Sequence, residues 1–439
     1  MSHESKQSFA RVLTLALSAT TGMWIFSYIA LLFAGKTGGE VLFILGVLCL
    51  PFASRYSKSL GEGAQVGFVS AFINLLLIGS IVGGKAPVEM MSQGIIWSIG
   101  LFVSSMIFGM IGATFHSSIR NIRHKFDWRV GFLSVASILV FLMLVTGGLV
   151  TGMEAGLAVP DWPNSYGHNM LLYPLNEMIA PENEGVFFEH AHRLTGMFVG
   201  LTSLVMVIAV WIWSKKYSVR ALAFTIFIFV CIQGLLGGLR VTGYLTFEQD
   251  REMLNPNLWI GVVHGVVGQL IFTGFVCLAA MFTEKWSLKE GTAGRGDLRW
   301  SLVLCASMVL QLILGAVYRH MMGDELLAPR ATHVLYAHIA FALLVLVLAI
   351  VVGIRLMSRE NRLLKNIGLT LHVLVLVQLL LGGGALLVII ISESASSIPS
   401  YELLTTTAHQ ANGALLLATS FLTMIWALPI KKQLGRNHD

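Results

Sequence analysis

Residues 186–213 read VFFEHAHRLTGMFVGLTSLVMVIAVWIW, a long apolar stretch that carries a glutamate, two histidines and an arginine near its start. About 20 apolar residues are enough for a helix that crosses a bilayer. Ionisable side chains inside such a helix are costly, and they usually mark a functional site. This stretch therefore predicts a membrane helix that contains part of a site.

The whole chain shares this apolar character. Its 439 residues are 56% hydrophobic and 12% charged, against the roughly 25% charged residues of a soluble domain. The mean hydropathy is +0.77. We expect an all-α integral membrane protein of about twelve transmembrane helices, the first being retained rather than cleaved as a signal peptide. The apolar stretches are 10–34, 38–54, 64–84, 94–115, 130–153, 186–213, 219–243, 257–283, 299–318, 332–354, 367–392 and 404–430.

The basic residues predict the orientation of these helices. If the N-terminus is inside, 22 of the 29 Lys and Arg residues fall in inner segments, as the positive-inside rule requires. We therefore expect a multi-pass protein of the cell's inner (plasma) membrane with both termini in the cytoplasm. Basic loops that face anionic lipid also explain the net charge of +6, so we expect no nucleic-acid partner.

An internal repeat divides the last eight helices. His192 and His264 recur as His338 and His409 about 145 positions further on. The motif QGLLGG at 233–238 recurs as QLLLGG at 378–383 with the same spacing. These matches predict a core of two repeated four-helix bundles, 130–283 and 299–430. Residues 1–115 show no such pattern, so we interpret them as a four-helix N-terminal extension of unknown role.

The four repeated histidines lie at similar predicted depth. In each half one histidine is on the second helix and one on the fourth, and both helices begin at the outer face. Each histidine should lie roughly 10 Å below that surface. Two imidazoles that face each other across a bundle are typical axial ligands of haem. The alternative is a hydrogen bond between helices, which is common for a single histidine but less expected for four repeated ones.

Glycines near the outer ends of the intervening helices favour the same interpretation. Without side chains they leave room for a flat macrocycle, although glycines also serve close helix packing. The candidates are Gly147, Gly148, Gly237, Gly238, Gly315, Gly382 and Gly383.

The two halves differ at one position. Glu189 lies three residues before His192, on the same helix face, and the second half has Leu335 in its place. This asymmetry indicates that the first half performs chemistry while the second holds a haem. The alternatives are an ion pair of Glu189 with Arg193 or a hydrogen bond with His190.

The loop before this helix contains GLAVPDWPNSYG at 156–167, which Pro and Gly make a structured turn. Its Trp162 either covers the cofactor pocket or anchors the loop at the membrane interface. Arg240, Arg319 and Arg251 are outward cations that could pair with haem propionates, because a guanidinium matches a carboxylate. They could equally be ordinary loop charges.

These motifs together resemble the haem A synthase family, which serves cytochrome oxidase assembly. The resemblance covers about 130–430. The segments that carry it are EHAHRLTG at 189–196, the Pro-Asp-Trp-Pro turn, GGLRVT at 237–242, VHG at 263–265, YAH at 336–338 and AHQ at 408–410. It implies oxidation of the C8 methyl of haem O to a formyl group, giving haem A. It also implies that His192 and His264 hold the substrate haem beside a catalytic Glu189, and that His338 and His409 hold haem B.

The chain departs from the family pattern in two places. Some members carry a cysteine pair in the first external loop, and 154–186 has none. An arginine often follows the histidine in the second half, where this chain has Ile339. A thiol step in haem delivery, and a propionate or packing role of an arginine at that position, therefore do not carry over from the family to this chain.

The partners follow from what the chain lacks. No nicotinamide or flavin fingerprint is present, so electrons should pass to a separate partner. Haem O would come from a haem O synthase or another haem donor, and the sequence leaves a homo-oligomer open. Two other classes are a di-haem electron-transfer cytochrome, which would place haems across the membrane, and a haem transporter or chaperone, which would not need Glu189.

Overall fold

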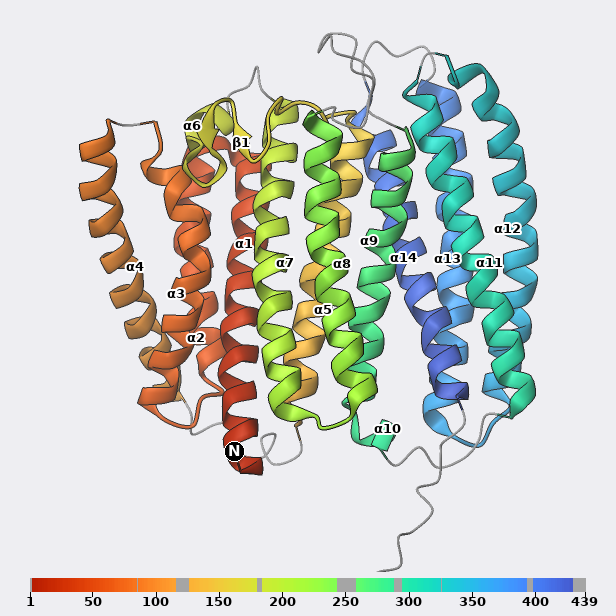
Figure 1. Ribbon diagram of the computed structural model, residues 1–439, viewed down its shortest axis with the longest axis horizontal. Helices are drawn as coiled ribbons and strands as arrows, with labels where there is room; N and C mark the ends of the chain where they lie inside the picture. Colours follow the sequence, from red (N-terminus) through yellow and green to blue (C-terminus); the bar gives the residue numbers. More distant parts are fainter. Residues whose placement is uncertain are drawn as a thin grey trace, which may run out of the picture. The chain divides into compact units, whose positions relative to one another are not determined.

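The computed structural model describes residues 2–84, 86–115, 126–179, 184–242, 258–287, 294–324, 326–392 and 398–428. Two compact units, Met1–Ile260 and Gly261–Asp439, make up the chain. Figure 1 shows that nearly all the described residues are helical. The division into an extension and two four-helix halves stays a prediction, and the first unit contains both the extension and most of the first half.

The first unit consists of helices that pack side by side, with a short loop structure between α5 and α7. Its elements are α1 (His3–Val47), α2 (Cys49–Ser54), α3 (Leu60–Val82), α4 (Pro87–Thr114), α5 (Trp128–Gly152), β1 (Asn164–Ser165), β2 (His168–Asn169), the 3-10 turn η2 (Met170–Leu172), α6 (Leu175–Met178), α7 (Glu184–Trp213) and α8 (Tyr217–Thr242). β1 and β2 pair antiparallel, Asn164 opposite Asn169.

The second unit is also built of long helices. Helix α9 (Leu258–Met281) enters it at Gly261, and α10 (Glu284–Ser287), α11 (Arg295–Met322), α12 (Ala328–Met357), α13 (Arg362–Ser392) and α14 (Ser400–Ala427) follow. Its core contains an apolar cluster in which Cys277 of α9 packs with Leu304 of α11, Leu356 of α12, Leu371 of α13 and Leu417 of α14.

The prediction of an all-α integral membrane protein is confirmed. Ten helices in the described part of the chain are long and apolar enough to cross a membrane. Helix α14 has 28 residues but is not among these ten, because polar residues such as Gln410 and Asn412 lower its hydropathy. The predicted twelfth span, 404–430, is therefore a long helix with a more polar composition than the others.

The predicted second span, 38–54, is the end of α1 together with α2. Helix α1 has no break in its bounds, but the chain reverses direction within it. A Cβ on Gly46 would lie 3.6 Å from Cα of Met23, and one on Gly22 would lie 3.1 Å from Sγ of Cys49. In a straight helix Met23 and Gly46 would be about 35 Å apart.

A buried ion pair joins α1 to α3 in the extension. Arg11 donates to Oε1 of Glu62 from Nε at 2.9 Å and from Nη2 at 2.6 Å. Ser8 Oγ also donates to Oε1, and the backbone N–H of Lys58 donates to Oε2. Arg11 is 4% exposed and Glu62 is 6% exposed. Each charge is buried, so each depends on the other for compensation.

Replacing Glu62 with Ala should therefore lower the free energy of unfolding by about 3–5 kcal/mol, because Arg11 would stay buried without its carboxylate. Thermal unfolding of the purified protein in detergent measures this change. The control is Lys58→Ala, since the exposed Lys58 ammonium lies 3.8 Å from Glu4 and its loss should change stability by only about 0.5 kcal/mol. Equal melting temperatures for the two variants would contradict the expectation.

Candidate functional site

Glu189 lies near the start of α7 and is 4% exposed. Its Oε1 accepts from Arg193, at 2.5 Å from Nη2 and 3.2 Å from Nε. Its Oε2 accepts the backbone N–H of Val159 at 2.7 Å. The ion pair with Arg193, one of the alternatives raised by the sequence, is thus present. The carboxylate is held in one orientation and retains an acceptor position on Oε2.

Arg193 connects this carboxylate to the preceding loop. Besides Glu189, its guanidinium donates to three backbone carbonyls: to Val159 at 2.9 Å, to Asp161 at 2.7 Å and to Asn164 at 3.0 Å. A guanidinium has five N–H donors in a rigid plane, which suits several acceptors at once. Arg193 therefore fixes residues 159–164 against the first turns of α7.

The Pro-Asp-Trp-Pro turn is closed by its own aspartate. Asp161 accepts the backbone N–H of Tyr166 at 2.7 Å and that of Gly167 at 2.8 Å. The Trp162 ring lies directly on Gly238 of α8, where a Cβ would overlap it. The structure therefore assigns Gly238 to helix–loop packing, one of the two roles expected for the glycines.

The two histidines of α7 have different surroundings. His190 is fully buried; its Nδ1 lies 3.2 Å from Ser165 Oγ, and its Nε2 has no hydrogen-bond partner. His192 is partly exposed, with Nδ1 3.1 Å from Thr146 Oγ1 of α5. A Cβ on Gly147 would lie 3.0 Å from Cε1 of His192, so this glycine leaves the imidazole uncovered.

Arg240 lies near the end of α8, beside the same loop. A Cβ on Gly156 would be 3.1 Å from its Nη2, and its buried Nε has no hydrogen-bond partner. Arg240 interacts electrostatically with Glu189. In the first unit, the carboxylate of Glu189, the imidazole of His190 and the guanidinium groups of Arg193 and Arg240 thus all lie beside one loop.

In the second unit, His338 of α12 and His409 of α14 face each other. Their ring centroids are 6.4 Å apart and their planes are inclined by 75°. An iron bound to one nitrogen of each ring at about 2 Å, with each ring centre ~1 Å further away, would separate the centroids by roughly 6 Å. The separation of the two rings is therefore close to that of two axial ligands of one iron.

Glycine accompanies these histidines as it does His192. A Cβ on Gly315 of α11 would lie 2.9 Å from Cε1 of His338, and one on Gly382 of α13 would lie 3.0 Å from Cε1 of His409. The same glycine–imidazole contact thus recurs in both units. It keeps the space beside each ring free of a side chain.

Two glutamines hold these imidazoles, and sequence reasoning gave them no role. Gln311 Nε2 lies 3.1 Å from Nδ1 and 3.3 Å from Nε2 of His338, and Gln378 Nε2 lies 3.2 Å from Nδ1 and 3.3 Å from Nε2 of His409. Asn412 donates to Oε1 of Gln378 at 2.7 Å, which turns the amide N–H groups toward His409. The signal was available, because Gln378 and Gln233 both precede the repeated glycine pairs by four residues.

His264 lies on α9 within the second unit, and His192 lies in the first. Their pairing stays a prediction. Gly148 is buried on α5. Gly237 is partly exposed on α8, and Gly383 is exposed on α13. Arg319, in the last turn of α11, is partly exposed, and Arg251 lies outside the described residues.

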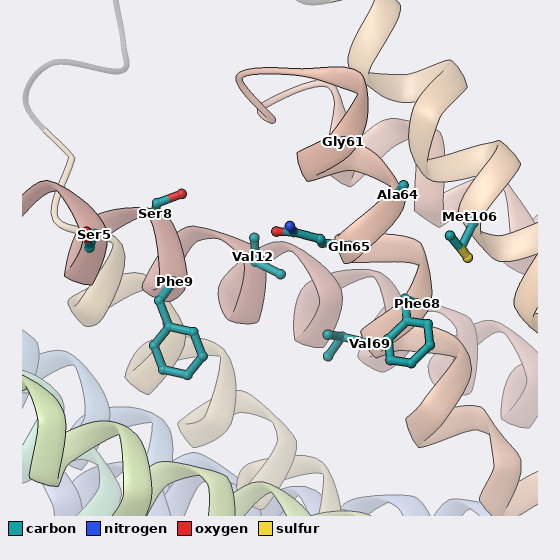
Figure 2. Close-up of a pocket in the computed structure, with 10 residues that line it drawn as sticks. All are labelled: Ser5, Ser8, Phe9, Val12, Gly61, Ala64, Gln65, Phe68, Val69 and Met106. Carbon is teal, nitrogen blue, oxygen red and sulfur yellow. The ribbon is translucent and has the colours of Figure 1, made fainter. Parts of the chain in front are cut away.

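A cavity of about 760 Å³ lies elsewhere, in the extension. Figure 2 shows side chains of α1, α3 and α4 around it, among them Phe9, Phe68 and Met106 with the polar Ser8 and Gln65. It contains no histidine. In the described part of the chain, no three His, Cys, Asp or Glu side chains gather to hold a bare metal ion, whereas a haem needs only two axial ligands from the protein.

Part of this chain is similar to known proteins. Residues 131–421 match the family model COX15-CtaA, described as "Cytochrome oxidase assembly protein". A "Heme A synthase" of Rhodospirillum centenum is 27% identical over 37% of this chain and 48% of its own length, so the chain spans about half of that relative. A "Heme A synthase" of Listeria monocytogenes is 23% identical over 56% of this chain and 75% of its own length.

The family model spans more than half of the chain and includes α7, with Glu189, as well as His338 and His409 of the second unit. The match ends within α14 and begins at the fourth residue of α5, which leaves the extension outside it. On this match, the chain belongs to the cytochrome oxidase assembly protein family.

Proposed function

We propose that this protein is a haem A synthase, an oxidoreductase that converts the C8 methyl of haem O to a formyl group. Family membership and the names of the relatives support the proposal. The observation that carries it is the buried Glu189 on the same helix face as His192, at a position that the second half fills with Leu335. Haem ligation alone does not need this carboxylate.

In the first half, His192 and His264 would hold haem O. A haem-bound substrate supplies an iron and a conjugated ring next to the methyl group that is oxidised. In the second half, His338 and His409 would hold haem B, as an electron relay or a structural cofactor. The separation of their rings and the glycines beside them support this assignment.

Glu189 would act on protons. Two successive oxidations, each of which adds the oxygen of one water and releases two electrons and two protons, would convert the methyl group to a gem-diol, which loses water to give the aldehyde. Each oxidation also releases protons, which a fixed carboxylate can accept, and a negative charge at this position stabilises positive charge that develops at the carbon. Val159 and Arg193 keep the carboxylate in place. The electrons would leave through a separate partner.

Arg240 would bind a propionate of the substrate, since its buried Nε lacks a partner and a guanidinium pairs well with a carboxylate. Replacing Arg240 with Leu should weaken haem O binding roughly tenfold to a hundredfold, the worth of a hydrogen bond to a charged group. The measurement is haem A formed as the haem O supply is varied. Arg240→Lys, which keeps the charge, should lose less. If Arg240→Leu needs no more haem O than the unmodified protein, Arg240 does not bind the substrate.

The same proposal places the protein in the plasma membrane with both termini in the cytoplasm, receiving haem O from a haem O synthase or another donor. The test of function is production of the chain in cells that make haem O but lack their own haem A synthase. We expect haem A in the membranes of these cells. If haem O is present, the protein is inserted and no haem A forms, the proposed activity is wrong.

A further inference from the structure

Helix α3 of the extension contacts the loop that covers Glu189. A Cβ on Gly79 would overlap the backbone carbonyl of Leu171, and one on Gly83 would overlap that of Leu172. At the next residue, Gly84 has φ +77° and would place a Cβ 2.9 Å from the ring of Pro174. Figure 1 shows α6 and the β1–β2 region beside the end of α3. The approach is so close that only glycine fits on the α3 side.

Helix α1 contacts α7, the helix of Glu189 and His192. The Tyr28 hydroxyl lies 3.0 Å from Oγ1 of Thr195, which is one turn beyond His192. The Trp24 ring lies 4.9 Å from that of Phe198. Trp24 also donates from Nε1 to Asn74 of α3 at 3.0 Å, so the two helices of the extension are linked to each other.

The loop contacts α7 and α3 through two different segments. Residues 159–164 are tied to α7 by Arg193 and by the Val159 N–H, while 171–174 rest on α3. Tyr173, in the second of these segments, is 2% exposed, and burial raises the pKa of its hydroxyl to about 12. Its ring lies 5.7 Å from Tyr166 and 5.0 Å from His190. The loop is therefore packed as a layer between the extension and α7.

We infer that α1 and α3 are positioning elements of the Glu189 site: they press the 156–178 loop against α7 and so fix the Val159 N–H and Arg193 on the carboxylate. The functional part of this inference rests on the proposed haem A synthesis. The family match begins at residue 131, so the positioning helices lie outside the part of the chain that it covers. Gly79, Gly83 and Tyr28 are the residues that act through the loop and α7.

The experiment compares Gly79→Ala and Gly83→Ala with Gly94→Ala and Gly100→Ala in the full-length membrane protein. The control glycines are on α4 and have open space around them, so all four changes add the same methyl group but only two meet the loop. The first readout is hydrogen–deuterium exchange of the backbone N–H groups of Val159, Tyr166 and Gly167, which the loop holds on carboxylates. We expect roughly tenfold faster exchange in the two α3 variants. The exchange rates of the two control variants should equal those of the unmodified protein.

The second readout is haem A formation, with haem B content as a check on folding. The α3 variants should make haem A about tenfold to a hundredfold more slowly, as expected for a misplaced catalytic group, and keep their haem B. Unchanged exchange at the three N–H groups overturns the inference, whatever the activity. Faster exchange with a normal rate overturns the functional part. If the unmodified protein makes no haem A, the proposed function fails, and exchange alone then decides whether the extension holds the loop.

Discussion

Glu189→Gln should retain both haems and accumulate haem O or a hydroxylated intermediate in place of haem A. The substitution keeps the size of the side chain but removes its charge and most of its basicity. Loss of a proton-accepting group typically slows a reaction by 10²–10⁴-fold. Extraction of the pigments and their separation by chromatography measures the ratio of haem O to haem A.

The ion pair with Arg193 calls for a control, because a glutamine amide cannot accept all the bonds that Glu189 accepts. Arg193→Lys keeps a cation for Glu189 but loses most of the bonds to the loop carbonyls. If Glu189 serves only to anchor this loop through Arg193, the two variants should be impaired alike. The catalytic role requires Glu189→Gln to be the more severe. Haem A at the normal rate in Glu189→Gln would rule that role out, and loss of all haem would make the carboxylate structural.

His338→Ala or His409→Ala should remove haem B from the second unit while the helices stay inserted. Each change deletes one of two axial ligands, whereas the apolar spans that determine insertion remain. The measurement is the absorption spectrum of the reduced protein together with the haem B content after extraction. We expect less than about a tenth of the haem B of the unmodified protein.

His372→Ala is the matched control for this loss. His372 is on α13 of the same unit, and its Nε2 lies 3.1 Å from the carbonyl of Ile350, away from the His338–His409 pair. This variant should keep its haem B. An unchanged haem B spectrum in both His338→Ala and His409→Ala would show that these two imidazoles are not the ligands.

The sequence predicted the helices well because the length of an apolar stretch determines a membrane span. The repeat also predicted that His338 and His409 lie at one depth on helices of the same unit, and the structure brings their rings together. Periodicity does not show how each helix is rotated. The repeated glutamines stand out in the sequence, but their contacts with these rings, like that of Trp162 with Gly238, depend on that rotation.

The role of the extension was beyond sequence reasoning for the same reason. Gly79 and Gly83 are ordinary small residues of an apolar stretch until the loop carbonyls are seen against them. Tyr28 is likewise one aromatic among many. The ion pair of Glu189 with Arg193 was foreseen as an alternative, but the three loop carbonyls that Arg193 also binds were not. These roles depend on contacts between segments that are far apart in the sequence, which sequence patterns do not reveal.

The most direct test of the account is the identity of the pigments that the purified protein carries when the cells supply haem O. Acid extraction, chromatography and mass spectrometry identify each haem. We predict haem B together with haem O or haem A in the same preparation, one for each half of the repeated core. Haem B as the single pigment, in both halves and with haem O available, would contradict the account and indicate a di-haem electron-transfer protein.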